Sequence, residues 1–175
     1  MKGGEFEMRH TKKLVLAALF AAAIAVCTRF TSIPIFGGMG YVHVGDAFIF
    51  LAASVLPVPY AMACAACGGA LGDLMSGFVA YMLPTAIIKA LMALMFFPSR
   101  GTQKLVNRKN LLSAVLAVIV LVGGYYIAEV IMYKSFISPI AGIYWNITQG
   151  LFSSAGYFFL AALLDRTNFK ERLGA

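Results

Sequence analysis

The chain alternates long apolar stretches with short polar, proline-containing or glycine-rich ones. A helix needs about twenty apolar residues to cross the hydrocarbon core of a bilayer, and several stretches approach that length. We predict an all-α membrane protein in which residues 1–175 form a single transmembrane domain. The six predicted membrane helices cover residues 12–30, 44–56, 59–78, 81–98, 111–134 and 142–164.

Prolines and glycines mark the breaks between these helices. The run Leu56-Pro57-Val58-Pro59 separates the second helix from the third, because proline stops a helix and restricts the residue before it. Residues 31–45 hold a proline and several glycines among apolar side chains. Because glycine lets a chain fold tightly, we expect this outside loop to act as a lid over a pocket. Residues 99–110, after Pro98, are predicted as a cytoplasmic loop.

The second helix is the shortest of the six. At about 1.5 Å per residue, the stretch 46–56 reaches only about half of the hydrocarbon thickness. We therefore expect it either to extend toward Val42 or to span part of the bilayer, shielded by other helices.

The composition agrees with a membrane protein, since 61% of the residues are hydrophobic and 12% are charged. In a soluble domain about a quarter are charged. The net charge of +7 does not indicate nucleic-acid binding, because the basic residues form three clusters at the ends of apolar stretches, as the positive-inside rule describes. The clusters are Lys2, Arg9, Lys12 and Lys13; then Arg100, Lys104, Arg108 and Lys109; then Arg166, Lys170 and Arg172.

These clusters place both termini and the 99–110 loop in the cytoplasm. The chain must then cross the membrane an even number of times between its amino end and that loop, and four helices satisfy this. The first helix could instead be a cleaved secretory signal, but no clear small-x-small cleavage site follows it.

The three cysteines, Cys27, Cys64 and Cys67, all lie in apolar stretches. Their odd number makes a disulfide framework a poor interpretation. Cys64 and Cys67 have the spacing of a redox or metal pair, but no second ligand pair accompanies them. We interpret them as small packing residues and expect no metal and no cofactor.

Ionisable residues in the membrane zone are costly unless paired or facing water, so each is a candidate site residue. They are Arg29, Asp46, Asp73, Lys89 and Glu129, with His43 close by. The predicted topology brings the outer ends of the helices and the 31–45 loop together at one pocket. Two alternatives stay open there, since Lys89 and Glu129 could both reach the pocket or could pair with each other.

The other two acidic residues also have structural interpretations. Asp46 follows Gly45 and is expected to be the N-cap of the second helix. Asp73 is expected to contact a ligand, to cap a helix end or to bind Arg29.

Trp145, Asn146 and Gln149 lie near the outer end of the sixth helix, with Trp145 and Gln149 on one face. An aromatic plate beside amides suits a flat, polar heterocycle, although Trp145 could also belong to the interfacial aromatic belt. Of the tyrosines we select only Tyr41, because it lies in the loop; Tyr81, Tyr125 and Tyr126 are set aside. The predicted substrate-binding residues are Tyr41, His43, Asp73, Lys89, Glu129, Trp145, Asn146 and Gln149.

Small residues recur at helix-packing spacing in two helices. In the first helix they are Ala17, Ala21 and Ala25, with Ala18 and Ala22 beside them; in the third they are Ala61, Ala65 and Gly69. Small residues four apart let another backbone approach closely in lipid. The first-helix surface either packs within this chain or meets a partner protein.

Several catalytic and nucleotide-binding motifs are missing from the sequence. It has no G-x-x-x-x-G-K-[ST], no H-E-x-x-H and no G-x-S-x-G. We therefore expect neither ATP hydrolysis nor another enzymatic activity from this chain.

Two motifs and the alanine-rich first helix resemble the S components of energy-coupling-factor (ECF) vitamin transporters. The motifs are Gly40-Tyr41-Val42-His43-Val44-Gly45-Asp46-Ala47-Phe48 and Gly68-Gly69-Ala70-Leu71-Gly72-Asp73-Leu74. The resemblance covers nearly the whole chain and is closest to the S proteins for hydroxymethylpyrimidine, vitamin B6 and queuosine precursors, often labelled riboflavin-like.

The resemblance implies a six-helix subunit of the bacterial plasma membrane that binds a vitamin from outside, under the first long loop. It also implies docking on a T component with two ATPase subunits, through an Ala-x-x-x-Ala surface that matches Ala17, Ala21 and Ala25, or Ala18 and Ala22. The subunit would then topple in the membrane, powered by the ATPases of its partners.

The sequence also leaves two alternative functions open. A stand-alone proton-coupled carrier would use Glu129, Lys89 and Asp73 as a relay. An intramembrane enzyme would use Asp73, Glu129 or His43 as acid and base, but no motif supports it.

Overall fold

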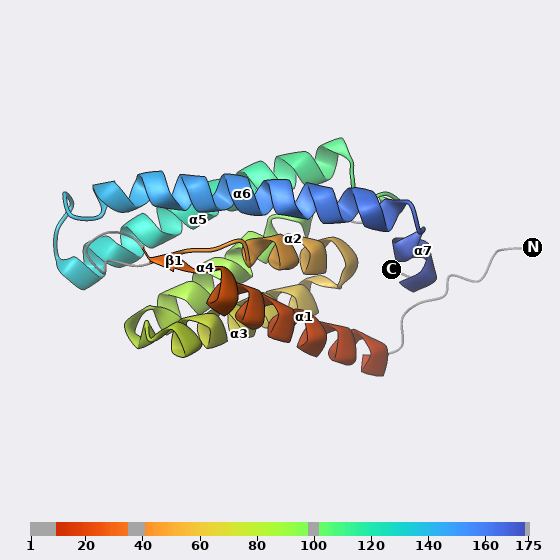
Figure 1. The fold of residues 1–175 in the computed structure, drawn as a ribbon, viewed down its shortest axis with the longest axis horizontal. Helices are drawn as coiled ribbons and strands as arrows, with labels where there is room; N and C mark the ends of the chain where they lie inside the picture. Colours follow the sequence, from red (N-terminus) through yellow and green to blue (C-terminus); the bar gives the residue numbers. More distant parts are fainter. Residues whose placement is uncertain (1–9, 35–40, 98–101, 174–175) are drawn as a thin grey trace, which may run out of the picture.

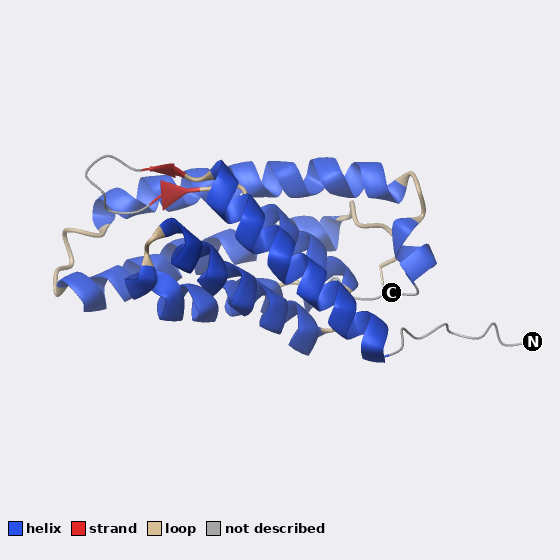
Figure 2. Ribbon diagram, turned by 60° about the horizontal axis from the view of Figure 1, so that its bottom comes forward, coloured by secondary structure: helices blue, strands red, loops and turns tan. Residues whose placement is uncertain are grey.

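The computed structural model describes residues 10–34, 41–97 and 102–173, and its fold is almost entirely helical (Figures 1 and 2). The elements are α1 His10–Thr31, β1 Ile33–Pro34, β2 Tyr41–Val42, α2 Asp46–Val55, α3 Val58–Ser76, η1 Val79–Tyr81, α4 Met82–Leu94, α5 Arg108–Tyr133, α6 Ile140–Asp165 and α7 Phe169–Leu173. The two short strands pair antiparallel, with Ile33 opposite Val42. Lys2, Arg9, Pro98, Arg100 and residues 35–40 of the predicted lid lie outside the described residues.

Four of these helices are long and apolar enough to cross a membrane: α1, α3, α5 and α6. The other two predicted membrane helices are shorter in the structure. The second covers Asp46–Val55, and the fourth is divided into the 3₁₀ turn η1 and α4, which ends at Leu94. The short helix α7 was not expected from the sequence.

Helix α2 is short because it lies inside the bundle rather than at its surface. It packs against α1, α3, α4 and α6, and every one of its residues except Phe48 is buried. The expected extension toward Val42 is wrong, since Val42 belongs to β2. The structure agrees with the other alternative, in which the neighbouring helices shield α2 from lipid. A shielded helix can be shorter than the hydrocarbon core is thick.

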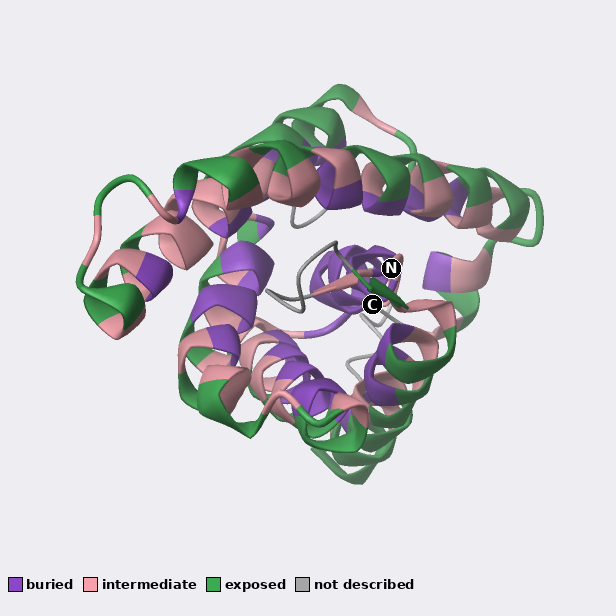
Figure 3. Cartoon of the chain, turned by 60° about the vertical axis from the view of Figure 1, so that its left-hand side comes forward, coloured by how far each residue is buried: buried purple, intermediate pink, exposed green. Residues whose placement is uncertain are grey.

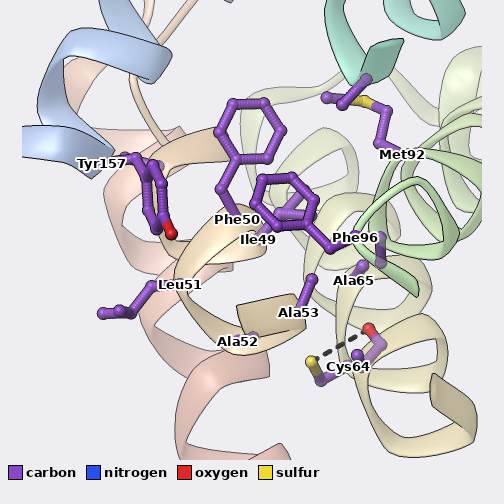
Figure 4. Packing of buried hydrophobic residues seen from close by; sticks show 14 of the residues in the cluster. Ile49, Phe50, Leu51, Ala52, Ala53, Cys64, Ala65, Met92, Phe96 and Tyr157 are labelled. Carbon is purple, nitrogen blue, oxygen red and sulfur yellow. Dashed lines mark hydrogen bonds between the residues drawn. The ribbon is translucent and has the colours of Figure 1, made fainter. Parts of the chain in front are cut away.

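The other helices form a ring around α2. α3 packs against both α1 and α4, α4 against α5, and α5 against α6. Figure 3 shows the buried residues on the inner sides of these helices and the exposed ones outside. The core includes Phe50, whose ring stacks on Phe96 at 5.3 Å and meets Tyr157 edge-on at 6.1 Å (Figure 4).

Helices α1 and α3 approach each other closely at Gly68. A Cβ added at Gly68 would lie 2.8 Å from the backbone oxygen of Ala21 and 2.8 Å from Cβ of Ile24, so only glycine fits there. On the same side of α1, Ala17 and Ala25 are buried. These alanines pack within the chain and are unavailable to a partner, whereas Ala18 and Ala22 are exposed.

The ends of α1, α6 and α7 and the segment before α5 meet at one end of the molecule (Figure 1). Lys12 Nζ donates to the backbone oxygen of Leu173 at 2.6 Å. The Asp165 carboxylate accepts the backbone N–H groups of Leu105 at 2.8 Å and Val106 at 2.9 Å. Described residues of all three basic clusters therefore lie at this end.

Cys27, Cys64 and Cys67 are free cysteines in the structure. Cys64 donates from its thiol to the backbone oxygen of Ala61 at 3.2 Å and is buried (Figure 4).

Candidate functional site

A cavity of about 140 Å³ lies between the end of α5, the start of α6, the end of α3 and the β2 strand. Since the basic clusters adjoin the opposite ends of α5 and α6, the cavity and the basic residues are at opposite ends of the bundle. The cavity is lined by Tyr41, His43, Asp73, Phe78, Tyr81, Tyr125, Glu129, Ser138, Ala141, Gly142, Trp145, Asn146 and Gln149.

All of the residues predicted to bind substrate line this cavity except Lys89. Lys89 points its ammonium at Asp46, with Nζ 2.7 Å from Oδ1 and 2.9 Å from Oδ2. Both side chains are inaccessible, with 1% and 0% of their surface exposed. The alternative pairing of Lys89 with Glu129 is wrong, because α2 occupies the centre of the bundle and presents Asp46 to α4.

Asp46 is also not the N-cap of α2. Gly45 holds that position, and no side chain caps the helix there. The Asp46 carboxylate instead accepts a third contact from Gln149 Nε2 at 2.9 Å. A buried ion pair needs such additional hydrogen bonds to offset the free-energy cost of removing two charges from water.

Gln149 connects this ion pair to the segment that enters α2. Its Oε1 accepts the backbone N–H of His43 at 3.4 Å, so both ends of the amide are used within the protein. Ser153 Oγ donates to the backbone oxygen of His43, also at 3.4 Å, and Val44 N–H donates to Thr31 Oγ1 at 3.2 Å. These contacts hold the segment that contains His43 against α6 and against the end of α1.

A backbone hydrogen bond determines the tautomer of the neutral His43 imidazole. Its Nδ1 accepts the backbone N–H of Gly45 at 3.0 Å, so the proton of the neutral ring is on Nε2. Burial lowers the pKa of His43 to about 4, with the Lys89 charge adding to this effect and the Asp46 charge opposing it. The ring is therefore neutral near pH 7, with its proton on Nε2, and it lines the cavity.

Asp73 contacts the loop rather than Arg29, which is exposed on α1. The Tyr41 hydroxyl donates to Asp73 Oδ1 at 2.6 Å, and Oδ2 is buried without a hydrogen bond to any described residue. Burial first, and then the Asp73 carboxylate, raise the pKa of Tyr41 well above its usual value. Tyr41 thus stays a hydrogen-bond donor. The Asp73 side chain does not cap the end of α3 as expected; at that end the backbone oxygen of Asp73 accepts Phe78 N–H at 2.9 Å.

Glu129 is the second carboxylate of the cavity and is 9% exposed. Among the described residues its hydrogen-bond donor is Tyr81, whose hydroxyl lies 3.4 Å from Oε1 and also contacts the hydroxyl of Tyr133. Gly142 faces the other oxygen, since a Cβ there would be 3.0 Å from Oε2. The start of α6 therefore leaves room for the Glu129 carboxylate.

Aromatic rings form a continuous series along one wall. Tyr41 lies 5.0 Å from Phe78, Phe78 lies 6.2 Å from Tyr81, and Tyr81 lies 6.4 Å from Tyr125, measured between ring centroids. Trp145, on α6, also lines the cavity. Such a surface suits the face of a flat ring.

Several lining residues were not selected from the sequence: Phe78, Tyr81, Tyr125, Ser138, Ala141 and Gly142. The two tyrosines were weighed and set aside, since tyrosine is common at membrane interfaces. Tyr126, also set aside, donates to the backbone oxygen of Phe136 instead. Ala141 and Gly142 carry no polar group that a sequence pattern could single out.

The described residues contain no group of three or more His, Cys, Asp or Glu side chains placed to hold a metal ion. What the cavity presents is a set of hydrogen-bonding groups and rings, which is typical of a binding site for a small molecule.

Comparisons with known proteins identify the family of this chain. A family model described as "ECF-type riboflavin transporter, S component" matches residues 8–166. The thiamine precursor transporter HmpT of Lactococcus lactis subsp. cremoris (strain MG1363) is 30% identical over 160 residues, which cover 91% of each chain. Together with the membrane-length helices, these matches show that the chain belongs to the ECF transporter S-component family, as a multi-pass membrane transport subunit rather than an enzyme.

Proposed function

We propose that this chain is the high-affinity substrate-binding subunit of an ECF-type importer for a small, flat heterocyclic vitamin or vitamin precursor. The observation that carries the proposal is the cavity at one end of the bundle, where aromatic rings and unused polar groups meet. Its 140 Å³ is close to the size of an engineered apolar cavity of about 150 Å³ that accepts benzene, so it suits a single ring.

Hydroxymethylpyrimidine is the first candidate among the substrates we consider, ahead of pyridoxine and a queuosine precursor. It is a single-ring precursor of thiamine, and the relative from Lactococcus lactis is named a thiamine precursor transporter. Trp145 stacks on the ring, while Tyr41, His43, Asp73, Glu129 and Asn146 supply polar contacts. Gln149 and Lys89 act indirectly, because Lys89 binds Asp46 and Gln149 binds both Asp46 and the backbone of His43.

The proposed topology has six membrane crossings with both termini in the cytoplasm, within one transmembrane domain. α2 and the η1–α4 unit supply the two crossings that are not made by the long helices. The gathering of basic residues at one end supports a cytoplasmic position for that end. The cavity then faces outward, where a binding subunit meets its substrate.

The proposed partners are a T component and two ATPase subunits, on which the loaded subunit topples to release its substrate inside. The exposure of Ala18 and Ala22 narrows the docking surface to these two residues of α1. Ala17 and Ala25 are already covered by the chain itself.

Uptake of labelled hydroxymethylpyrimidine by cells tests this function. The chain is expressed alone and together with the T component and ATPase subunits, in a host that lacks its own uptake route. We expect accumulation only when all subunits are present. Accumulation by the chain alone, driven by a proton gradient, would replace this function with that of a stand-alone carrier.

A further inference from the structure

The lining of the cavity is acidic and has no balancing cation. Asp73 and Glu129 both belong to it, whereas none of its described residues is a lysine or an arginine. Lys89 is a buried cation, and both oxygens of Asp46 contact its ammonium. Lys89 lies over the Tyr125 ring at 5.4 Å and acts on Asp73 through its charge alone, and in the described part of the chain it forms no direct ion pair with Asp73 or Glu129.

These carboxylates also retain unused hydrogen-bond acceptors. Asp73 is 4% exposed, and its Oδ2 has no hydrogen bond to any described residue. The Thr85 hydroxyl, which is hydrogen-bonded to the Tyr125 hydroxyl at 2.9 Å, also interacts with the Asp73 carboxylate. Glu129 receives only the long contact from Tyr81 in the described part of the chain. A buried carboxylate oxygen without a hydrogen-bond donor is unfavourable, so a ligand that supplies N–H groups would complete this site.

The walls beside these carboxylates favour positive charge as well. Tyr41, Phe78, Tyr81 and Tyr125 form the ring series, and Trp145 adds a further face. The faces of aromatic rings attract a cation through their quadrupole, and most strongly when water is excluded. An anion in the same place would meet two carboxylates in a poorly solvated cavity.

Building on the proposed function, we propose that the cavity recognises the amino-bearing, protonatable edge of a single-ring nitrogen heterocycle and rejects anionic forms of it. Glu129 and Asp73 accept hydrogen bonds from that edge, and Glu129 is the residue that determines specificity. On the opposite edge of the ligand, His43 Nε2–H and the Asn146 amide donate to acceptor atoms.

Matched ligands test the selectivity directly on the purified full-length protein in detergent, by calorimetry. Hydroxymethylpyrimidine is compared with its analogue in which a hydroxyl replaces the ring amino group, and pyridoxamine is compared with pyridoxine. We expect each amino compound to bind about 10- to 100-fold more tightly than its partner. The phosphate ester of hydroxymethylpyrimidine should bind at least about 100-fold more weakly than the free alcohol.

Two variants test the role of Glu129. Glu129→Gln keeps the shape but loses the charge and an acceptor, so the preference for the amino compound should fall by about tenfold or more. Glu171→Gln, at an exposed position of α7, is the control and should keep the wild-type preference.

Gly142→Ala perturbs the Glu129 carboxylate without removing it. This variant provides the test if Glu129→Gln does not fold. The new Cβ would lie 3.0 Å from Glu129 Oε2 and should weaken the amino preference, whereas Gly123→Ala, with open space around it, should not.

The outcomes separate this inference from the proposed function. Tight binding of a vitamin with no amino preference, or equal binding of the phosphate ester, overturns the inference and leaves the transport function standing. An unchanged preference in Glu129→Gln also overturns it. If no compound of the panel binds, both the inference and the proposed function are contradicted.

Discussion

Lys89 and Asp46 form a buried ion pair whose two members come from α4 and α2. The variant Lys89→Met leaves the Asp46 charge buried without its partner. We expect the free energy of unfolding to fall by about 3–5 kcal/mol, measured by denaturant or thermal unfolding in detergent.

The double variant Lys89→Met/Asp46→Leu is the control for this pair. It removes both charges and should recover most of the lost stability, because replacing a whole buried pair is often neutral. A single variant as stable as the wild type would show that the pair contributes nothing.

His43 should make stability depend on pH. The unfolded chain has a histidine pKa near 6.5, and burial lowers the pKa of folded His43 to about 4. Between these values the unfolded state binds a proton that the folded state does not. Stability should therefore rise as the pH increases from about 4 to about 6.5, by about 3 kcal/mol, and be lost as the pH falls.

The variant His43→Asn isolates this effect from other titrating groups. Asp46, Lys89 and Tyr41 face or interact with the His43 ring and remain in the variant. The stability difference between wild type and variant, followed by thermal unfolding between about pH 4 and about pH 7, should change across this range. A constant difference would mean that His43 does not titrate as expected.

Sequence patterns identified most of the polar cavity residues but not their partners. Charged and amide residues are rare in membrane helices, so Glu129, Asp73 and Asn146 stood out. The pairing of Lys89 was not predictable in the same way, because it depends on how α2 and α4 are rotated and at what depth they meet. Tyr81 and Tyr125 were missed because a tyrosine gives the same signal at a lipid interface as at a binding site.

At the scale of elements, the main unexpected feature is the position of α2. Apart from Asp46 and Ser54 its residues are apolar, and they cover all sides of the helix, which is also true of a helix exposed to lipid. Hydropathy alone therefore could not distinguish a central helix from a peripheral one. The length of α2 was the available signal, and it left two alternatives open: an extension toward Val42 or a shielded position.

The contact between α1 and α3 depends on the absence of a side chain at Gly68. In Gly68→Ala the new Cβ would lie 2.8 Å from the Ala21 backbone oxygen, which cannot move independently of α1. We expect a loss of about 1–3 kcal/mol in the free energy of unfolding, measured by thermal unfolding in detergent.

Gly123→Ala provides the comparison for Gly68, since it is also a helical glycine but has open space around it. Alanine should stabilise that helix by about 0.5–1 kcal/mol. Equal effects of the two substitutions would mean that α1 and α3 are not as close as the structure places them.

At the scale of the whole molecule, the cavity and the basic residues occupy opposite ends of the bundle. This arrangement agrees with the proposed function, in which the substrate is captured at one end and the cytoplasmic ATPases act at the other. The α1 helix runs between the ends, and its exposed alanines lie along the bundle's outer surface.

Ala18→Trp and Ala22→Trp test α1 as the docking surface. A large side chain at either exposed position should hold the T component away and reduce uptake by about tenfold or more, without changing substrate affinity of the purified subunit. Ala162→Trp, at an exposed alanine of α6, is the matched control and should leave uptake intact. Since Ala25 is buried, Ala25→Trp should instead reduce stability and substrate binding together. If Ala18→Trp and Ala22→Trp transport normally, the partner contacts another face of the bundle, and the exposed small residues of α1 serve no docking role.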